Sequence, residues 1–429
     1  MQTAGFYGWK LLAVFWFILF VNLAFPAYGS SVVNAYMAAD LQLDRKTLGL
    51  IFSVYFVMSG LMAPLVAVCV NRFGTRVTLL LGSLFLLAGS LLMALVVNTG
   101  WQAVVVFGLV IGTGVITGGA LAAQASVTSW FIRKRALAMS IMLTAAGVGG
   151  FIAAPLLNYV ITVAGDWRAG WWLIFGLVCI SLLMTALFVK NKPVDIGQFP
   201  DGATGEATLS SDPASQLVKG VHITAENWTF GESLRSPTLW VLLLSALGFS
   251  AGYALFIAHG VVHLQDIGYS AEVAALAVSI MVFANLAGKL IFGVLGDRIE
   301  PRYIWGVAVF IFGIGLVLAA KATSTVEVYI FAICLGLGFG TSVTCLMTVL
   351  SNYFGTGAYA SIVGIAMAVQ TTISAIVPLM AGYMYDTYGS YVWSFYGTSF
   401  WCFIGAILIA CARPPLRKNI WSFKPVLTL

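Results

Sequence analysis

The stretch NLAGKLIFGVLGDRIEPR, from Asn285 to Arg302, joins an apolar run to a charged turn. Such a junction is typical of the end of a membrane-spanning helix. One lysine, Lys289, interrupts the apolar part eight residues before Asp297, so it lies roughly 12 Å inside the boundary at about 1.5 Å per helical residue. A lysine near the centre of a membrane helix costs about 2.5 to 3.5 kcal/mol on insertion scales. The stretch therefore predicts a membrane fold and a lysine that is retained for a specific reason.

The composition of the whole chain also indicates a membrane protein. Of its 429 residues, 61% are hydrophobic and 8% are charged, which is more apolar side chain than a water-soluble core can bury. Apolar runs long enough to cross about 30 Å of hydrocarbon as helices recur along the chain. There are twelve, at residues 11–36, 47–71, 77–97, 101–128, 136–164, 169–189, 236–264, 270–296, 303–320, 326–352, 358–385 and 390–411. The expected fold class is an all-α membrane protein with twelve transmembrane helices.

The basic residues follow the predicted topology. If both termini are cytoplasmic, sixteen Lys and Arg residues lie in inner segments and only four, Arg45, Lys46, Arg168 and Lys321, lie in outer loops. This distribution is the positive-inside bias of membrane proteins. It predicts a multi-pass protein of the cell membrane with both ends in the cytoplasm, and it accounts for the net charge of +6 without a nucleic-acid partner.

The chain divides into two related halves. A long polar interruption leaves six apolar runs on each side, Pro155 and Pro378 are 223 positions apart, and Arg72 and Arg298 are 226 positions apart. Several such matches at nearly one offset indicate an internal duplication. We expect an N-terminal six-helix bundle at residues 1–190, a cytoplasmic linker at 191–235, and a C-terminal six-helix bundle with a short cytoplasmic tail at 236–429.

The turn after Lys289 resembles a known loop motif. GVLGDRIEPR is similar to the Gly-x-x-x-Asp-Arg-x-x-x-Arg motif of the major facilitator superfamily, and its fixed positions here are Gly293, Asp297, Arg298 and Arg302. The first half carries a degraded copy, VNRFGTR, which keeps Arg72 and Arg76 but has Asn71 in place of the acid. The resemblance implies that these loops control the conformation of the protein.

Three further segments narrow the resemblance. They are YGWK with AFP in the first helix (7–10 and 24–26), WFIRKRALAMSIMLTAAGVGG entering the fifth (130–150), and the eighth helix itself. They look like the monocarboxylate transporter family and its microbial relatives, which include the oxalate/formate antiporter group. The resemblance covers nearly the whole chain. It implies two pseudo-symmetric six-helix bundles around a central substrate cavity, working by alternating access.

Lys289 is the principal candidate for the substrate site. All fifteen acidic residues lie in predicted loops or at helix ends, so no carboxylate within the membrane is available to pair with it. A structural role, with the ammonium held by carbonyls or hydroxyls of other helices, is the alternative. Helix eight of the monocarboxylate carriers resembles Asp-x-x-x-Arg, whose arginine binds the substrate carboxylate, and this chain has Asn285-x-x-x-Lys289 there. A spacing of four places both residues on one helix face.

Other polar residues within the spans are weaker candidates. Tyr28, Ser31, Gln124 and Gln370 could contact the substrate, although each type of residue more often makes a packing hydrogen bond between membrane helices. A lysine that the family has just after the helix-one proline is Ala27 here, so a substrate with one carboxylate is expected. His259 and His263 have a spacing that could bind zinc, but no third ligand accompanies them. We expect no metal or cofactor, and His259 is a candidate for proton coupling at the outer end of its helix.

These observations favour a secondary active transporter of small monocarboxylate anions such as lactate or pyruvate. If Lys289 loses its proton when the anion leaves, transport is proton symport; if it keeps its charge, transport is anion exchange of the oxalate/formate type. Drug or cation efflux is disfavoured because a cation would meet Lys289. A substrate sensor on the same fold would need a signalling domain, which the short predicted tail does not supply. No arrangement of catalytic residues at membrane depth suggests an enzyme.

Overall fold

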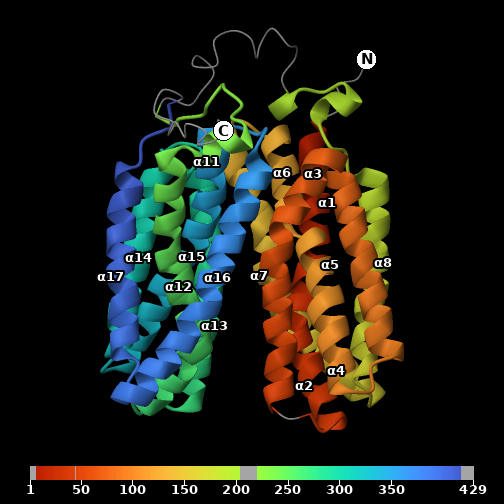
Figure 1. Cartoon of the computed structure of the whole chain (residues 1–429), viewed down its shortest axis with the longest axis vertical. Helices are drawn as coiled ribbons and strands as arrows, with labels where there is room; N and C mark the ends of the chain where they lie inside the picture. Colours follow the sequence, from red (N-terminus) through yellow and green to blue (C-terminus); the bar gives the residue numbers. More distant parts are fainter. Residues whose placement is uncertain (1–5, 44, 203–219, 417–429) are drawn as a thin grey trace, which may run out of the picture.

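The computed structural model describes residues 6–43, 45–202 and 220–416. Within these ranges the chain forms helices and their connections, so the all-α prediction is confirmed. The helices form two bundles that lie side by side, with α1 to α8 in one and α12 to α17 in the other (Figure 1). We call the end of the bundles that carries α11 (Phe230–Leu234) the linker end, and the opposite end the far end.

The first bundle is built from irregular as well as regular helices. Its elements are α1 (Tyr7–Leu19), η1 (Phe20–Gly29), α2 (Ser30–Asp40), α3 (Arg45–Leu95), α4 (Gly100–Ala103), η2 (Val104–Ile111), α5 (Gly112–Thr117), α6 (Ala120–Trp130), α7 (Arg135–Ala164) and α8 (Arg168–Phe188). The π-helical segment η1 contains Pro26, whose ring removes a backbone donor and disturbs the regular ladder. The two short 3-10 turns η3 (Pro193–Ile196) and η4 (Pro200–Gly202) follow α8.

The second bundle consists of six long helices. They are α12 (Pro237–Asp266), α13 (Ala271–Leu295), α14 (Pro301–Ala320), α15 (Thr325–Phe354), α16 (Tyr359–Tyr388) and α17 (Val392–Cys411). Serine caps begin two of them, because Ser270 accepts a hydrogen bond from the Val273 amide and Ser324 accepts one from the Glu327 amide.

The number of membrane spans follows from one backbone kink. Eleven helices in the described ranges are long and apolar enough to cross a membrane, and the second, Leu50–Leu95, has 46 residues. At about 1.5 Å per residue that length is roughly 70 Å, more than twice a bilayer core. Gly74 breaks it with φ of 82°, a left-handed value that favours glycine. The described part of the chain therefore contains twelve spans, as predicted.

The two bundles repeat the same contact. Arg76 donates a hydrogen bond from its guanidinium to the Ala186 carbonyl at the end of α8. Arg302 donates one to the Ala412 carbonyl just after α17, at 2.6 Å. Each partner in the second bundle lies 226 positions after its counterpart, 76 to 302 and 186 to 412. The internal duplication therefore extends from sequence to hydrogen bonding.

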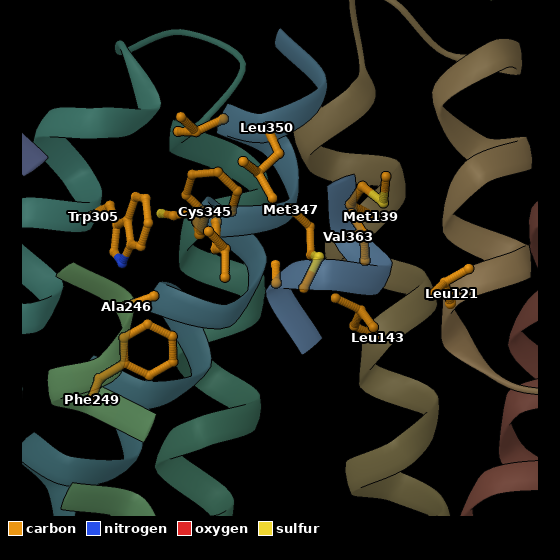
Figure 2. Packing of buried hydrophobic residues seen from close by; sticks show 14 of the residues in the cluster. Leu121, Met139, Leu143, Ala246, Phe249, Trp305, Cys345, Met347, Leu350 and Val363 are labelled. Atoms are coloured by element: carbon orange, nitrogen blue, oxygen red, sulfur yellow. The ribbon is translucent and has the colours of Figure 1, made fainter. Parts of the chain in front are cut away.

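Among the described residues, the bundles share a hydrophobic core at the linker end. One cluster of buried residues runs through both bundles and includes Leu143 of α7, Met347 of α15 and Val363 of α16 (Figure 2). A second cluster lies entirely between Val21 and Val178, within the first bundle. Along α7, residues 136–145 contribute to the shared cluster and residues 153–161 to the second. The bundles are therefore packed together near the linker end, and beyond it the first bundle has a core of its own.

The described parts of the connection between the bundles are fastened to the linker end. The Asp201 carboxylate accepts hydrogen bonds from the Ile132 and Arg133 amides at 3.0 and 2.8 Å. On the other bundle, the Thr224 amide donates to the Asn352 carbonyl at 2.8 Å. We propose residues 191–235 as the linker between two domains, because these contacts attach each of its ends to the bundle next to it in sequence.

Candidate functional site

Helices α7 and α13 form the junction on which the site is built. They run in opposite directions, α7 away from the linker end and α13 toward it (Figure 1). A Cβ at Gly293 would lie 2.7 Å from the Ser140 side chain, so the absence of a side chain at Gly293 permits the close approach of the two helices. The junction therefore holds side chains of the two bundles at short range.

Lys289 lies at the inner limit of the shared core. It is six residues before the end of α13, about 9 Å from the end of the helix, and it is 9% exposed. Its Nζ donates a hydrogen bond of 3.4 Å to the carbonyl of Leu143, across the junction on α7. The side chain therefore points between the bundles, neither into lipid nor back to the membrane surface.

The ammonium of Lys289 has little to balance its charge. Among the described side chains no carboxylate lies within 4.0 Å of it. Its one hydrogen bond there is long and goes to a carbonyl within a helix, which is a weak partner for a full charge. An ammonium carries three donors, so the described residues leave capacity for an anion at this point.

Asn285 lies one helical turn from Lys289, but its oxygen is turned toward α15. The Oδ1 atom is buried without a hydrogen-bond partner among the described residues. It lies 2.9 Å from where a Cβ would be at Gly340 of α15. Asn285 and Lys289 share one face of α13, as the spacing predicts. The carboxamide oxygen of Asn285 packs against α15.

Tyr28 lies farther along the junction than Lys289 does. Its ring lies against α7 at Gly150, where a Cβ would be 3.3 Å from the ring, and the residue is 50% exposed. Gly150 is seven residues beyond Leu143, which corresponds to about 10 Å along the helix.

Gln370 joins two helices of the second bundle. Its Oε1 accepts a hydrogen bond of 2.9 Å from Ser250 of α12, and its Nε2 donates to the Ala366 carbonyl at 3.3 Å. Both its oxygen and its nitrogen are therefore already used in hydrogen bonds within the second bundle.

The described contacts of Lys289 include none to the three remaining predicted residues. Gln124 lies in α6, 3% exposed, with its Oε1 unpartnered among the described residues. Ser31 falls in α2, and its side chain lies outside the described set. The His259 ring stacks on Tyr391 at 4.9 Å near the far end. His263, one turn on, is buried and bonds the Ala319 carbonyl at 2.9 Å, as a packed structural histidine would.

The loop motif of the second half connects the bundles. Asp297 accepts hydrogen bonds from the Ala136 and Leu137 amides at 2.8 and 3.1 Å, at the start of α7. A carboxylate there satisfies free amides and complements the positive end of the helix dipole. Burial raises the pKa of Asp297 to about 6, although these two amides act in the opposite direction. Arg298 is exposed beside it.

The loop of the first half makes the corresponding contact without a charge. Asn71, which takes the place of the acid, donates to the Ser361 hydroxyl at 2.7 Å in the first turn of α16. Arg72 lies over the ring of its neighbour Phe73 at 5.4 Å. The two loops therefore hold the linker end together, one through a carboxylate and the other through an amide.

The sequence did not single out two residues whose contacts the structure shows. Arg135 is 4% exposed and donates from Nη1 to the Asn352 side chain of the second bundle at 2.8 Å. Arg135 lies in the segment 130–150, and the family resemblance of that segment could have drawn attention to it. Tyr253 of α12 stacks on Phe339 of α15, with ring centroids 3.7 Å apart. No signal separates it in sequence from the many other aromatic residues of the spans.

A groove elsewhere on α13 lies outside this site. It has a volume of about 460 Å³ and is lined by residues of α13 and α15 that include Phe283, Ala287 and Leu337. At 100° per residue, Phe283 and Ala287 lie on the other side of α13 from Lys289. Phe283 is 74% exposed, so the groove faces outward from the protein.

Comparison with known proteins identifies the fold and its relatives. A sequence model described as the Major Facilitator Superfamily matches residues 11–273 and 260–427. Monocarboxylate transporter 12 of Rattus norvegicus is 26% identical over 437 residues, covering 95% of this chain and 86% of that protein. The oxalate:formate antiporter of Oxalobacter formigenes is 27% identical over 230 residues, covering 54% of this chain and 49% of that protein. The structure of the E. coli fucose:proton symporter has a TM-score of 0.69 at 14% identity, covering 94% and 97% of the two chains. Both the twelve-helix fold and the predicted resemblance are confirmed.

Proposed function

We propose that this chain, which belongs to the major facilitator superfamily, is a secondary active transporter of small monocarboxylate anions such as lactate or pyruvate. The observation that carries the proposal is Lys289, a buried ammonium between the bundles with one weak carbonyl partner among the described residues. A charge in such a place is unfavourable unless an anion or an equivalent partner balances it. The similarity to a monocarboxylate transporter over 95% of the chain supports this class of substrate.

The packing of the bundles suits transport by alternating access. The shared core closes the linker end, and beyond residue 145 of α7 the first bundle has a core of its own. We infer that this arrangement is the state open toward the far end. From the excess of basic residues at the linker end, we place that end and both termini in the cytoplasm, in the cell membrane. The protein then takes up its anion from the outside in this state.

A transport assay tests the role of Lys289. In proteoliposomes, the Lys289→Gln variant is expected to lose uptake of a labelled monocarboxylate, while Lys289→Arg keeps part of it because its charge remains. Lys321→Gln makes the same change in the loop after α14 and is expected to transport like the wild type. Wild-type rates in Lys289→Gln would contradict the proposal.

Two modes of coupling remain as alternatives, and proton symport is the one we favour. In symport, Lys289 takes up a proton with the anion and releases it afterwards, so the empty carrier returns uncharged. In exchange, Lys289 keeps its charge and the carrier returns only with a second anion; the similarity to an oxalate:formate antiporter supports this alternative. Vesicles that contain no organic anion distinguish the modes. A pH gradient alone drives uptake by a symporter and drives none by an obligatory exchanger.

A further inference from the structure

Residues 221–228 of the connection between the bundles lie against the end of α15, and we call them the strap. The Thr224 amide donates a hydrogen bond to the Asn352 carbonyl at 2.8 Å, and the Trp228 amide donates one to the Phe354 carbonyl at 3.3 Å. Both carbonyls belong to the last turn of α15, where a helix has no partners of its own for them. The strap therefore supplies hydrogen bonds that the end of this helix lacks.

The strap is anchored to the second bundle at two points. At the first, the His222 amide donates to the Glu300 carboxylate at 2.7 Å, and the other oxygen of this carboxylate accepts from the Tyr353 hydroxyl at 2.9 Å. At the second, the Trp228 ring is buried and packs edge-on against Phe354, with centroids 5.5 Å apart and an angle of 82° between the planes. Buried groups thus hold the strap at both of its ends.

The strap also reaches the seam between the two bundles. Val221 and Ile223 line a cavity of about 10 Å³, whose other walls include Arg135 of the first bundle. Asp297 and Asn352 of the second bundle line the same cavity. These three wall residues make the hydrogen bonds that join the bundles at the linker end, and Arg135 and Asn352 are only 4% and 3% exposed. The strap therefore helps to cover these hydrogen bonds.

Asn352 is bonded to the strap and to the first bundle at the same time. Its carbonyl accepts from the Thr224 amide and its side-chain oxygen accepts from Arg135, both at 2.8 Å. A hydrogen bond to a guanidinium is stronger where water is kept away from it. Displacement of the strap would admit water to this bond and leave the Asn352 carbonyl without its partner. The strap and the contact between the bundles therefore stabilise each other.

We propose that the strap is a conformational device, which stabilises the state closed at the linker end and whose displacement favours opening of that end. The proposal rests on the alternating access of the proposed function and is independent of which substrate is carried. The connection between the bundles then does more than join them, because a change in residues 221–228 is transmitted to the seam.

Hydrogen–deuterium exchange of the purified full chain, without substrate, tests the proposal. Trp228→Ala removes one anchor and should speed exchange in the strap. Amides in the first turn of α7, two of which bond to Asp297, should then exchange about tenfold faster, as the loss of a hydrogen bond to a charged group allows. Trp228→Phe keeps a ring against Phe354 and should restore much of the protection. Trp101→Ala is the control, because Trp101 is 70% exposed in α4 at the far end (Figure 1), and it should leave both segments unchanged.

Glu300→Ala removes the other anchor and makes the same test if Trp228→Ala does not fold. Faster exchange in the strap with unchanged exchange in α7 would overturn the proposal, since the strap would then only cap α15. Faster exchange throughout both bundles would overturn it as well, because the anchors would then serve general stability. Unchanged exchange in the strap would show that these residues do not hold it. Failure of the proposed function appears separately, as wild-type protein that transports no monocarboxylate, and leaves these results as they stand.

Discussion

Two charged residues near the end of α13 differ in how well the protein satisfies their charges. Asp297 has its charge answered by two backbone amides of α7 at 2.8 and 3.1 Å. Lys289, eight residues earlier, has one carbonyl at 3.4 Å. The carboxylate therefore has two hydrogen-bond partners within the protein, and we propose that it holds the junction together. The ammonium of Lys289 has no such set of partners, and for that reason we propose that it binds the substrate.

The raised pKa of Asp297 predicts a measurable pH dependence. Burial raises the folded pKa from 3.8 to about 6, so the protonated form stabilises the fold below about pH 4, and this contribution is lost as the pH rises through 6. The Asp297→Asn variant carries a neutral amide at this position at every pH. The stability of the variant relative to the wild type, followed by thermal unfolding, should therefore rise between pH 5 and 7 by an amount on the order of 1 kcal/mol. A constant difference over this range would argue against burial as the cause.

Much at the residue scale could be predicted from sequence, and the failures have a common cause. Lys289 could be singled out because a charge in an apolar run is conspicuous in one dimension. Asn285 was placed on the correct helix face, but the direction of its oxygen depends on the missing side chain of Gly340, 55 positions away. Tyr253 could not be singled out, because only the folded protein brings its ring onto Phe339 of another helix.

At the scale of elements, helix contacts in the second bundle depend on small residues. Helix α15 passes so close to α13 that a Cβ on Gly340 would lie 2.1 Å from the Asn285 carbonyl oxygen. Thr341, the next residue, donates to the Gly288 carbonyl of α13 at 3.1 Å. This pair of helices fixes the orientation in which α13 presents Lys289 to the first bundle.

Gly340→Ala is therefore expected to destabilise the protein by about 1 to 3 kcal/mol, as overpacking does. The clash is with backbone atoms, which cannot turn aside. Gly176→Ala, in α8, is the matched control because nothing lies within 4 Å of its added methyl group, and it should have no adverse effect. Thermal unfolding in detergent measures both. Equal midpoints for the two variants would show that α13 and α15 can separate without loss.

The elements themselves were largely predictable, because apolar length alone defines a membrane span. The second and third spans were predicted to be separate, and the non-helical backbone at Gly74 separates them. The exception is an irregular helix. The π-helical turns of η1 were not foreseen, since the hydrophobic pattern of a span carries no information about the register of its backbone hydrogen bonds.

At the scale of the whole molecule, hydrogen bonds at the linker end hold the two related bundles together. Arg135 of the first bundle donates to Asn352 of the second, and Asp297 of the second accepts from the start of α7 in the first. The first-half counterpart of Asp297 is the neutral Asn71, bonded to Ser361. In the proposed transport cycle, opening of the linker end would break all three contacts, so we propose that they stabilise the state in which that end is closed.

Removal of the Arg135 contact should shift this balance. Asn352→Ala leaves a buried guanidinium nitrogen unpaired, and loss of a hydrogen bond to a charged group corresponds to about tenfold or more in an equilibrium. Amides in the first turn of α7 should then exchange with deuterium correspondingly faster. Asn98→Ala removes a 2.8 Å bond to Arg168 at the far end and should leave that exchange unchanged. Unaltered exchange in Asn352→Ala would mean that the contact between the bundles at the linker end does not depend on Arg135.

The central claim is that Lys289 binds the carboxylate of the substrate, and ligand binding to purified protein tests it most directly. Monocarboxylates are titrated into the wild type, Lys289→Gln and Lys321→Gln while the thermal unfolding midpoint is followed, since a ligand that binds only the folded state raises it. We expect the midpoint to rise with concentration in the wild type and in Lys321→Gln, and to stay constant in Lys289→Gln. An equal rise in Lys289→Gln would contradict the account.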